Sequence, residues 1–445
     1  MQTLQPSTEI VEKVLNPQKP SDGTFYRPMT YCVTQDTEES VLVYNVLTKN
    51  LIELSKAEAK ILEKPFIYHE AEDDNTVREL IAMRFLVPED HDDYKAMIEL
   101  RQLAKLIGKG KNKTYTILTT TDCNARCFYC YELGRSRVKM TEQTAHKVAD
   151  FIEESKIEIQ WFGGEPLYNR EAIDIICQDL QTKGCEYTSM MVTNAYLFDK
   201  AMVQKAVNLW HLKKVQVTLD GTEIVYNRCK AFIYKDGSAY QRVLRNIGFL
   251  LDAGIYVNIR LNIDLHNAED LLLLVDELKE QFDGRKELTV YSHTIFEKTL
   301  KQARSDESRR LLYAKQDILN EHINQAGFAS KKKLNMEIKV NHCKVDSGNS
   351  EMILPDGHLG LCEHCTEDHF IGHISSSDRD YTAIREQQEN IEDTVCRNCP
   401  VCPECIRLKI CDSSQICYPE DKERKIRNIK KIMSSYKQRQ DLSVN

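Results

Sequence analysis

The chain has 445 residues, of which 42% are hydrophobic, and its formal net charge is −8 at pH 7. A chain of this size and composition is globular and long enough for roughly two or three domains. Its acidic balance argues against a protein that binds nucleic acid through bulk charge. The N-terminus shows no secretory signal, and no apolar run is long enough to span a bilayer. We therefore expect a soluble, cytoplasmic protein that acts on neither nucleic acid nor membrane.

The first 106 residues are expected to form a small module of strands followed by helices. Residues 30–35 and 40–54 alternate between apolar and polar side chains, as strands do, and helical patterns follow at 55–64 and 76–86. This order favours a winged-helix-like fold. The polar stretch 107–114 is typical of a linker.

From residue 114 to about 330, strand-like and amphipathic helical segments alternate six times. This rhythm predicts an α/β fold with a parallel sheet, either a partial (β/α)6, TIM-like barrel or a doubly wound sheet. In both architectures, ligands gather at the carboxyl ends of the strands. The expected strands are 114–120, 157–163, 188–194, 215–220, 256–263 and 287–293.

Twelve of the sixteen cysteines are concentrated in two places, which in a reducing compartment is typical of metal sites rather than disulfides, and only Cys32, Cys177, Cys185 and Cys229 are scattered. The first is TTTDCNARCFYCYE, residues 119–132, where Cys123, Cys127 and Cys130 follow the first barrel strand with the spacing C-x3-C-x2-C. A [4Fe–4S] cluster has four iron atoms that each need an outside ligand, so three cysteines leave one iron open. A three-cysteine zinc site completed by a distant histidine is the alternative.

The second barrel strand ends in WFGGEPLYN, which contains the tetrapeptide Gly163-Gly164-Glu165-Pro166. This tetrapeptide and the cysteine motif, with Tyr129 before its last cysteine, resemble the radical S-adenosylmethionine (radical SAM) superfamily. The resemblance covers residues 114–420. It implies that the open iron chelates the methionine end of SAM. One electron then cleaves SAM to methionine and a 5′-deoxyadenosyl radical, which abstracts hydrogen from a substrate.

Polar residues at further strand ends are, by the same resemblance, candidates to hold the carboxylate, ribose or adenine of SAM. For each of them the alternative is a polar side chain that ties a loop to a strand end, and Asp220-Gly221 also suits a simple turn. The full set of expected cofactor-binding residues is Tyr129, Gly163, Gly164, Glu165, Pro166, Asn194, Thr218, Asp220, Arg260 and Asn262.

The second concentration of cysteines lies between residues 343 and 417. Cys343, Gly357 and Cys362 match C-x9–15-G-x4-C, the opening of the SPASM domain, which adds auxiliary [4Fe–4S] clusters to radical SAM enzymes that act on peptides and proteins. The spacings before Cys411 and Cys417 depart from the SPASM pattern. Zinc ribbons or a ferredoxin-like run are the other interpretations of CRNCPVCPEC.

By this resemblance the auxiliary ligands divide into two sets, in which the fourth iron of the first cluster is either open or bound by Cys365 or a substrate thiolate, and Cys402 is an alternative to a neighbouring ligand. The first auxiliary cluster is assigned Cys343, Cys362 and Cys411, and the second is assigned Cys396, Cys399, Cys405 and Cys417. The expected domains are 1–106, the radical SAM core 114–330, the SPASM domain 340–420 and a basic helical tail 421–445.

Glu363 directly follows Cys362. In the anaerobic sulfatase-maturating relatives the matching position is an aspartate that acts as general base, which makes Glu363 a candidate catalytic base. An exposed carboxylate in the polar run CEHCTED is the alternative. The change from aspartate to glutamate also weakens the case for a sulfatase maturase.

The expected function is therefore that of a radical SAM oxidoreductase that matures a ribosomally synthesised peptide, through a thioether or another side-chain cross-link. One alternative is oxidation of a Cys or Ser residue to formylglycine. An alternative of another class is an iron–sulfur electron-transfer or carrier protein that makes no radical. The expected partners are a precursor peptide and reduced flavodoxin or ferredoxin as electron donor. By the resemblance, the leader of this peptide adds as a strand to the N-terminal module, and a purely structural cap is the alternative role of this module.

Overall fold

The computed structural model describes residues 1–5, 18–70, 74–107, 112–130, 132, 134, 136–295, 304–328, 349–360, 362–363, 370–380, 394–405 and 419–444. These residues fall into two compact units. The larger unit contains the described residues of 112–330 and 348–381, and the smaller contains those of 1–111 and 382–445. The units thus group the C-terminal segments with the N-terminal ones, a division that differs from the four expected domains.

Six parallel strands form the centre of the larger unit. They are adjacent in chain order, and each neighbouring pair is parallel. This is the mostly parallel α/β sheet that the sequence predicts, and all six expected strands are confirmed. The strands are β8 Lys113–Thr120, β9 Lys156–Gly163, β10 Glu186–Thr193, β11 Leu212–Leu219, β12 Tyr256–Ile263 and β13 Leu288–Thr294.

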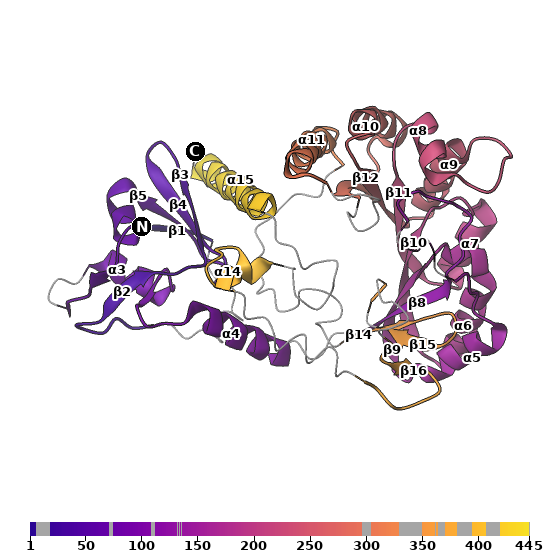
Figure 1. The fold of residues 1–445 in the computed structure, drawn as a ribbon, viewed down its shortest axis with the longest axis horizontal. Helices are drawn as coiled ribbons and strands as arrows, with labels where there is room; N and C mark the ends of the chain where they lie inside the picture. The colour runs from indigo at the N-terminus through magenta and orange to yellow at the C-terminus, as the bar shows by residue number, and fades with distance from the viewer. Residues whose placement is uncertain are drawn as a thin grey trace. The chain divides into compact units, whose positions relative to one another are not determined.

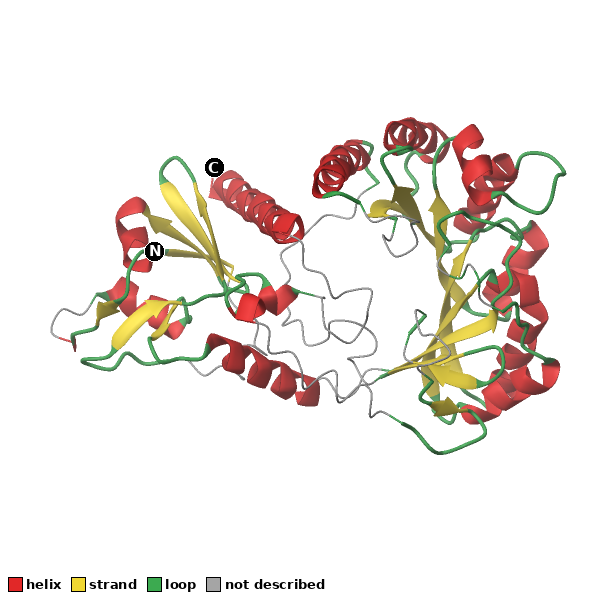
Figure 2. Cartoon of the chain, viewed as in Figure 1, coloured by secondary structure: helices red, strands yellow, loops and turns green. Residues whose placement is uncertain are grey.

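Helices connect these strands and lie along one face of the sheet, as Figures 1 and 2 show. The two helical patterns expected at 141–155 and 269–282 are confirmed by α5 and α10. The helices are α5 Glu142–Phe151, α6 Arg170–Thr182, α7 Lys200–Asn208, α8 Glu223–Lys230, α9 Ala239–Asp252, α10 Ala268–Phe282 and α11 Asp306–Gln325, with a short 3₁₀ turn, η3, at Pro166–Asn169.

Successive side chains of each strand point alternately to the side of the sheet that faces the helices and to its inner side. In β11, Val215, Val217 and Leu219 are buried in the main hydrophobic cluster, whereas Gln216 and Thr218 between them are half-buried. Polar side chains therefore collect on the inner face of the sheet, away from the helices.

Three short strands extend the sheet beside β8. Strand β14 (Ser350–Ile353) pairs parallel with β8, and β15 (His358–Gly360) and β16 (Gly372–His373) follow antiparallel. Glu351 of β14 is buried and pairs with Lys113 at 3.0 Å and with Arg379 at 3.3 Å. Because Glu351 is level with Tyr115, this cluster of charges lies toward the amino end of β8 and ties the extension to the sheet.

The smaller unit contains two antiparallel sheets, with strand orders β1-β5-β4-β3 and β6-β2-β7. The strands expected in its N-terminal part are confirmed, and so is the helical segment expected at 55–64, whereas the helix expected at 76–86 ends at Ala82 and Leu86 begins a strand. The strands are β1 Gln2–Gln5, β2 Phe25–Pro28, β3 Cys32–Asp36, β4 Ser40–Asn45, β5 Leu51–Ser55, β6 Phe66–Ile67 and β7 Leu86–Pro88. The helical segments are α2 Lys56–Ala59, η1 Lys60–Leu62, α3 Asn75–Ala82, α4 Asp93–Ile107, α14 Thr394–Arg397, η6 Cys402–Glu404 and α15 Pro419–Val444.

Helix α15 packs against the N-terminal sheet of this unit. Its Ile429 and Met433 belong to the same hydrophobic cluster as Leu42 and Tyr44 of β4. Lys437 of α15 also forms an ion pair with Glu53 of β5. The basic C-terminal helix is therefore an integral part of the core of this unit. Among the described residues, no helix is both long and apolar enough to cross a membrane.

Candidate active site

The loop that carries Cys123, Cys127 and Cys130 leaves the carboxyl end of β8, where the sequence predicts it. All three thiols are half-buried. The Cys123 sulfur accepts a hydrogen bond from the Ala125 amide at 3.3 Å, and a turn joins the Cys130 amide to the Cys127 carbonyl at 3.2 Å. Burial, and next the Glu165 carboxylate, raise the pKa of the Cys123 thiol to about 12. Burial likewise raises the pKa of Cys127 and Cys130.

The two glycines at the end of β9 hold this loop against the sheet. The Gly164 amide donates to the Thr120 carbonyl at 3.0 Å. A Cβ atom on Gly164 would lie 2.3 Å from the carbonyl oxygen of Asp122, and one on Gly163, whose φ is +130°, would lie 2.1 Å from that of Thr120. In this structure the missing side chains thus make room for the backbone that leads into Cys123.

Glu165 joins the ends of β9 and β10. Its buried carboxylate accepts hydrogen bonds from the Thr193 hydroxyl at 2.8 Å, the Asn194 amide at 2.8 Å and the Leu167 amide at 3.2 Å. Burial raises the pKa of the Glu165 carboxyl to about 7, although these hydrogen bonds act in the opposite direction. Pro166 begins the turn η3, and its carbonyl accepts from the Thr119 hydroxyl at 3.1 Å.

Asn194, at the carboxyl end of β10, reaches the cysteine loop. Its side-chain amide donates to Oδ1 of Asn124 at 2.6 Å and lies 3.8 Å from the Cys123 sulfur. The side-chain nitrogen of Asn124 is buried and has no hydrogen-bond partner in the described part of the chain. A free buried donor beside a thiol-rich loop fits a site that takes a further acceptor, such as a cluster with its ligand.

Lys230 belongs to the same site, although no sequence motif points to it. Its ammonium, at the end of α8, lies 3.0 Å from Oδ2 of Asp220 and donates to the Tyr129 hydroxyl at 2.9 Å and to the Thr218 hydroxyl at 2.7 Å. Burial by itself lowers the pKa of Lys230, but the Asp220 carboxylate and then Tyr129 outweigh it and hold that pKa above its usual range.

The hydrogen bonds of this network bring four of the predicted residues together. The Tyr129 hydroxyl donates to Asp220 at 2.6 Å, and the Asn262 side chain donates to Asp220 at 3.0 Å and to Tyr129 at 3.2 Å. Thr218 joins the network through Lys230. Burial, followed by the Asp220 charge, raises the pKa of Tyr129.

Arg260 stands on the same inner face of the sheet but is not part of this network in the described contacts. It is half-buried and lies opposite Thr218 in the strand register. Burial raises the pKa of Tyr291, and the charge and hydrogen bond of Arg260 lower it by a smaller amount. The sheet therefore gathers Tyr129, Thr218, Asp220 and Asn262 around Lys230, and places Arg260 beside them.

Four cysteines of the C-terminal part of the smaller unit are described, and each is three residues from the next: Cys396, Cys399, Cys402 and Cys405. Consecutive turns join the amide of each to the carbonyl of the one before, at 2.9 to 3.1 Å. Side chains three residues apart in such turns lie on the same side of the chain. Cys402 is buried in the hydrophobic cluster of this unit, and the Lys425 ammonium lies 3.4 Å from the Cys405 sulfur.

The remaining predicted ligands are only partly visible. Cys343, Cys365, Cys411 and Cys417 lie outside the described residues. Cys362 and Glu363 belong to the larger unit and follow β15, which runs antiparallel to β14 and so leads away from the end of β8 that carries the cysteine loop.

Among the described residues, no three His, Cys, Asp or Glu side chains converge as closely as the ligands of a single metal ion. Cluster ligands need not converge in this way, because each cysteine binds a different iron atom. Three thiols in one loop, with a buried ammonium and the buried Asn124 amide beside them, are a donor set that fits a [4Fe–4S] cluster with one open iron.

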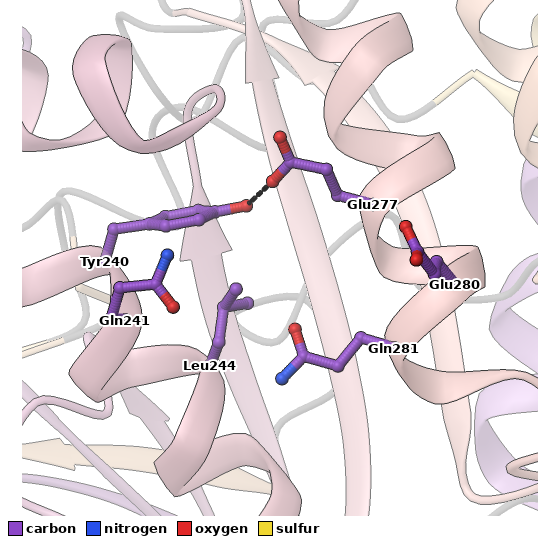
Figure 3. Close-up of a pocket in the computed structure, with 6 residues that line it drawn as sticks. All are labelled: Tyr240, Gln241, Leu244, Glu277, Glu280 and Gln281. Carbon is purple, nitrogen blue, oxygen red and sulfur yellow. Dashed lines mark hydrogen bonds between the residues drawn. The ribbon is translucent and has the colours of Figure 1, made fainter.

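Figure 3 shows a separate pocket between α9 and α10. The Tyr240 hydroxyl donates to the Glu277 carboxylate there at 2.5 Å. The pocket lies in the helix layer, on the other face of the sheet from the polar inner side, and none of the predicted site residues lines it. Its lining residues are Tyr240, Gln241, Leu244, Glu277, Glu280 and Gln281.

Residues 117–289 match the family model of the radical SAM superfamily. This segment begins within β8, contains the cysteine loop and the GGEP tetrapeptide, and reaches β13. The resemblance that the motifs predict is therefore confirmed, and this part of the chain is a radical SAM domain.

Two curated relatives show how far the sequence similarity extends. An uncharacterised protein of Methanocaldococcus jannaschii is 32% identical over 117 residues, which cover 25% of this chain and 40% of the relative. A GTP 3′,8-cyclase of Limosilactobacillus fermentum is 26% identical over 179 residues, which cover 37% of this chain and 51% of the cyclase. The chain thus spans about half, or less, of the length of these relatives.

Solved structures extend the fold comparison. The structure of native anSMEcpe, a sulfatase maturase, with bound AdoMet matches with a TM-score of 0.53 and 14% identity, over 73% of this chain and 99% of that one. The same protein with AdoMet and the Cp18Cys peptide matches with a TM-score of 0.51 and 15% identity over the same shares. At these identities the likeness concerns the fold.

Proposed function

We propose that this chain is a radical SAM peptide maturase. It would cleave SAM reductively and use the radical to oxidise a ribosomally synthesised peptide, forming a thioether or another side-chain cross-link. The observation that carries the proposal is that the three-cysteine loop and the buried Lys230–Asp220–Tyr129 network meet at one end of the sheet. An electron carrier that makes no radical has no need of a buried polar site beside its cysteines.

The loop residues Cys123, Cys127 and Cys130 would hold the cluster, and the inner face of the sheet would hold SAM. When bound, the cluster and SAM supply the electron and the carbon–sulfur bond whose cleavage generates the deoxyadenosyl radical. Lys230 and Asp220 keep Tyr129 in position through hydrogen bonds of 2.9 and 2.6 Å. Asn194, Thr218, Arg260 and Asn262 offer the polar groups that would orient the amino acid and nucleoside ends of SAM.

A peptide substrate is supported by the cysteine-rich C-terminal region and by the fold shared with anSMEcpe, which was solved with the Cp18Cys peptide. We propose that this region is a SPASM domain. Cys396, Cys399 and Cys405 would hold one auxiliary cluster with Cys417. Cys362 would contribute to another with Cys343 and Cys411. These clusters would bind a peptide thiolate or accept the electron that the substrate loses.

The N-terminal part is proposed to recognise the leader of the precursor peptide. Strand β3 is an edge of its four-stranded sheet, and an extended peptide that adds to such an edge gains main-chain hydrogen bonds.

Reductive SAM cleavage tests this function directly. The protein is purified without oxygen, reconstituted with iron and sulfide, and given dithionite and SAM, and 5′-deoxyadenosine is measured by mass spectrometry. We expect the wild type to form it and the Cys123→Ala/Cys127→Ala/Cys130→Ala variant to form none. Cys185→Ala, which removes a cysteine outside the site, should remain active. An iron-loaded wild type that forms no deoxyadenosine would refute the radical function.

The products formed from a cysteine-containing precursor peptide then distinguish cross-linking from formylglycine formation. A cross-link removes a pair of hydrogen atoms and leaves the sulfur in the peptide. Conversion of a Cys thiol to an aldehyde would instead support the formylglycine alternative.

Glu363 is proposed as the proton acceptor in the peptide reaction. Such a base acts on the substrate after hydrogen abstraction. Glu363→Gln should therefore form deoxyadenosine at the wild-type rate but release less modified peptide. Equal product yields from both proteins would remove Glu363 from the mechanism.

A further inference from the structure

The surface around the cysteine loop carries several exposed cations. Two segments run beside this loop and are joined to it by backbone hydrogen bonds. The Thr121 amide donates to the Val138 carbonyl at 2.9 Å, and the Ile233 amide donates to the Asn124 carbonyl at 2.9 Å. The described residues 136–139 and 231–235 therefore form the two rims of the cysteine loop.

Both rims carry exposed cations. Arg137 and Lys139 are exposed on the first rim, and Lys235 is exposed on the second. Arg137, with 58% of its side chain exposed, shares the Asp122 carboxylate with Arg126, at 3.6 and 3.7 Å. One carboxylate thus faces two guanidinium groups next to Cys123. This basic surface stands out in a chain whose net charge is −8.

Exposed apolar side chains lie among these cations. Phe128 is 56% exposed, Ile233 is 40% exposed and Val138 is 38% exposed. Phe128 stands between Cys127 and Tyr129 in the sequence and packs edge-on against the Tyr129 ring, with centroids 5.2 Å apart.

The acidic groups beside these apolar side chains are Asp122, which pairs with both arginines, and the exposed Asp236, which pairs with Arg242, so cations outnumber carboxylates around these apolar groups. Apolar groups among mostly basic side chains are typical of a surface that binds an acidic partner.

We propose that this surface, made of the cysteine loop and its two rims, docks an acidic one-electron carrier protein. The proposal rests on the proposed function, in which each SAM cleavage consumes one electron. The carrier would lose that electron from its reduced flavin or iron–sulfur group, and the centre held by the three cysteines would gain it, with no bond made or broken in the transfer. Phe128 lies where the carrier would come nearest to the cysteines.

The basic rims would attract the carrier and orient it. Complexes of electron-transfer proteins are small and transient, so charge complementarity contributes mainly to how fast the partners meet and how they align. Exposed charges act over about 10 Å at 0.1 M salt, so this attraction weakens as salt is added.

Charge reversal on the two rims tests the proposal. Arg137→Glu/Lys235→Glu changes one exposed cation on each rim and leaves the three cysteines and the Lys230 network intact. Lys213→Glu/Lys286→Glu makes the same change in charge at exposed positions next to the amino ends of β11 and β13, far along the strands from the cysteine loop. Arg137→Gln/Lys235→Gln is a milder second variant that introduces no new carboxylate beside Asp122.

Two measurements are made on each holoenzyme with a purified bacterial flavodoxin as probe. Binding is measured by calorimetry at low and high salt. Deoxyadenosine formation is measured with reduced flavodoxin and, separately, with dithionite, which needs no docking surface.

We expect the charge-reversed rims to weaken flavodoxin binding and to slow the flavodoxin-driven reaction by about tenfold at low salt. The neutral variant should show a smaller loss, and the control pair should match the wild type. Dithionite-driven activity should be the same in all four proteins.

Equal flavodoxin binding by wild type and charge-reversed protein would overturn the proposal. So would an equal loss with both reductants, which would instead assign the rims to the substrate peptide or to the site itself. A wild type that is inactive with dithionite would refute the proposed function, whereas the binding comparison would still decide whether the surface docks the carrier.

Discussion

The ammonium of Lys230 lies 3.0 Å from Oδ2 of Asp220, and only 3% and 1% of the two side chains are exposed. A buried charge needs such a partner, because removal of one member leaves the other without compensation. The pair also places a hydrogen-bond donor and an acceptor on the Tyr129 hydroxyl, which belongs to the cysteine loop. Stability of the larger unit and geometry of the site are therefore coupled through these two residues.

The first prediction concerns this pair. Lys230→Met should lower the free energy of unfolding by about 3–5 kcal/mol, because Asp220 stays buried without its partner. Lys230→Arg, which keeps the charge, should lose less. The double variant Lys230→Met/Asp220→Asn should recover part of the loss. Denaturant unfolding of the metal-free proteins measures all three, and simple additivity of the single changes would show that the pair is not coupled.

The second prediction concerns the glycine that supports the cysteine loop. Gly164→Ala should displace the backbone before Cys123, since its Cβ would lie 2.3 Å from the Asp122 carbonyl oxygen. We expect the reconstituted variant to bind less iron and sulfide per chain than the wild type. Gly248→Ala is the matched control, because no atom lies within 4 Å of its Cβ and it sits within helix α9. Full iron content in Gly164→Ala would contradict the packing described for this loop.

The third prediction is a pH dependence in the smaller unit. Burial raises the pKa of Asp93, but hydrogen bonds from His91, Arg27 and Thr30 outweigh it and hold that pKa well below its usual range. A carboxyl group whose pKa is lower in the folded state stabilises that state at any pH above the pKa of the unfolded chain, which is about 3.9 for Asp. This contribution is lost as the pH falls from there through the pKa of the folded state. Asp93→Asn should therefore be less stable at neutral pH.

Acid titration of the unfolding free energy checks this third prediction. Between about pH 4 and pH 2, the wild type should lose stability more steeply than Asp93→Asn, because only the wild type takes up a proton at this position. Parallel curves over that range would show that Asp93 does not provide the acid sensitivity.

The fourth prediction tests whether the C-terminal helix is part of the smaller unit. Met433 is fully buried in the cluster that contains Leu42 and Tyr44, so Met433→Ala should cost about 2–5 kcal/mol of stability. Lys431→Ala, at an exposed position of the same helix, should stay within about 0.5 kcal/mol of the wild type. Similar unfolding of both variants would mean that α15 does not contribute to this core.

Local patterns in the sequence were enough to predict the six parallel strands and the cysteine loop. The alternation in β11 and the spacing of Cys123, Cys127 and Cys130 are properties of neighbouring residues, and they depend on backbone geometry and ligand chemistry that act over short stretches. The resemblance to radical SAM enzymes also made Tyr129, Asp220 and Asn262 candidates for one cofactor site at the carboxyl ends of the strands. In the structure these three side chains are joined by hydrogen bonds.

The burial of Lys230 and the packing of α15 depend on tertiary structure and could not be predicted from the sequence. Nothing in the sequence separates Lys230 from Arg228 in the same helical turn, yet the first is buried against Asp220 and the second is exposed. Similarly, the charged sequence of α15 resembles a free surface helix, and only packing reveals that Ile429 and Met433 face the N-terminal sheet. The spacing of neighbouring residues thus determined which chemistry this chain carries. Which charged and apolar side chains support that chemistry was decided by the tertiary structure, because burial and pairing between distant residues depend on contacts that form only when the chain is folded.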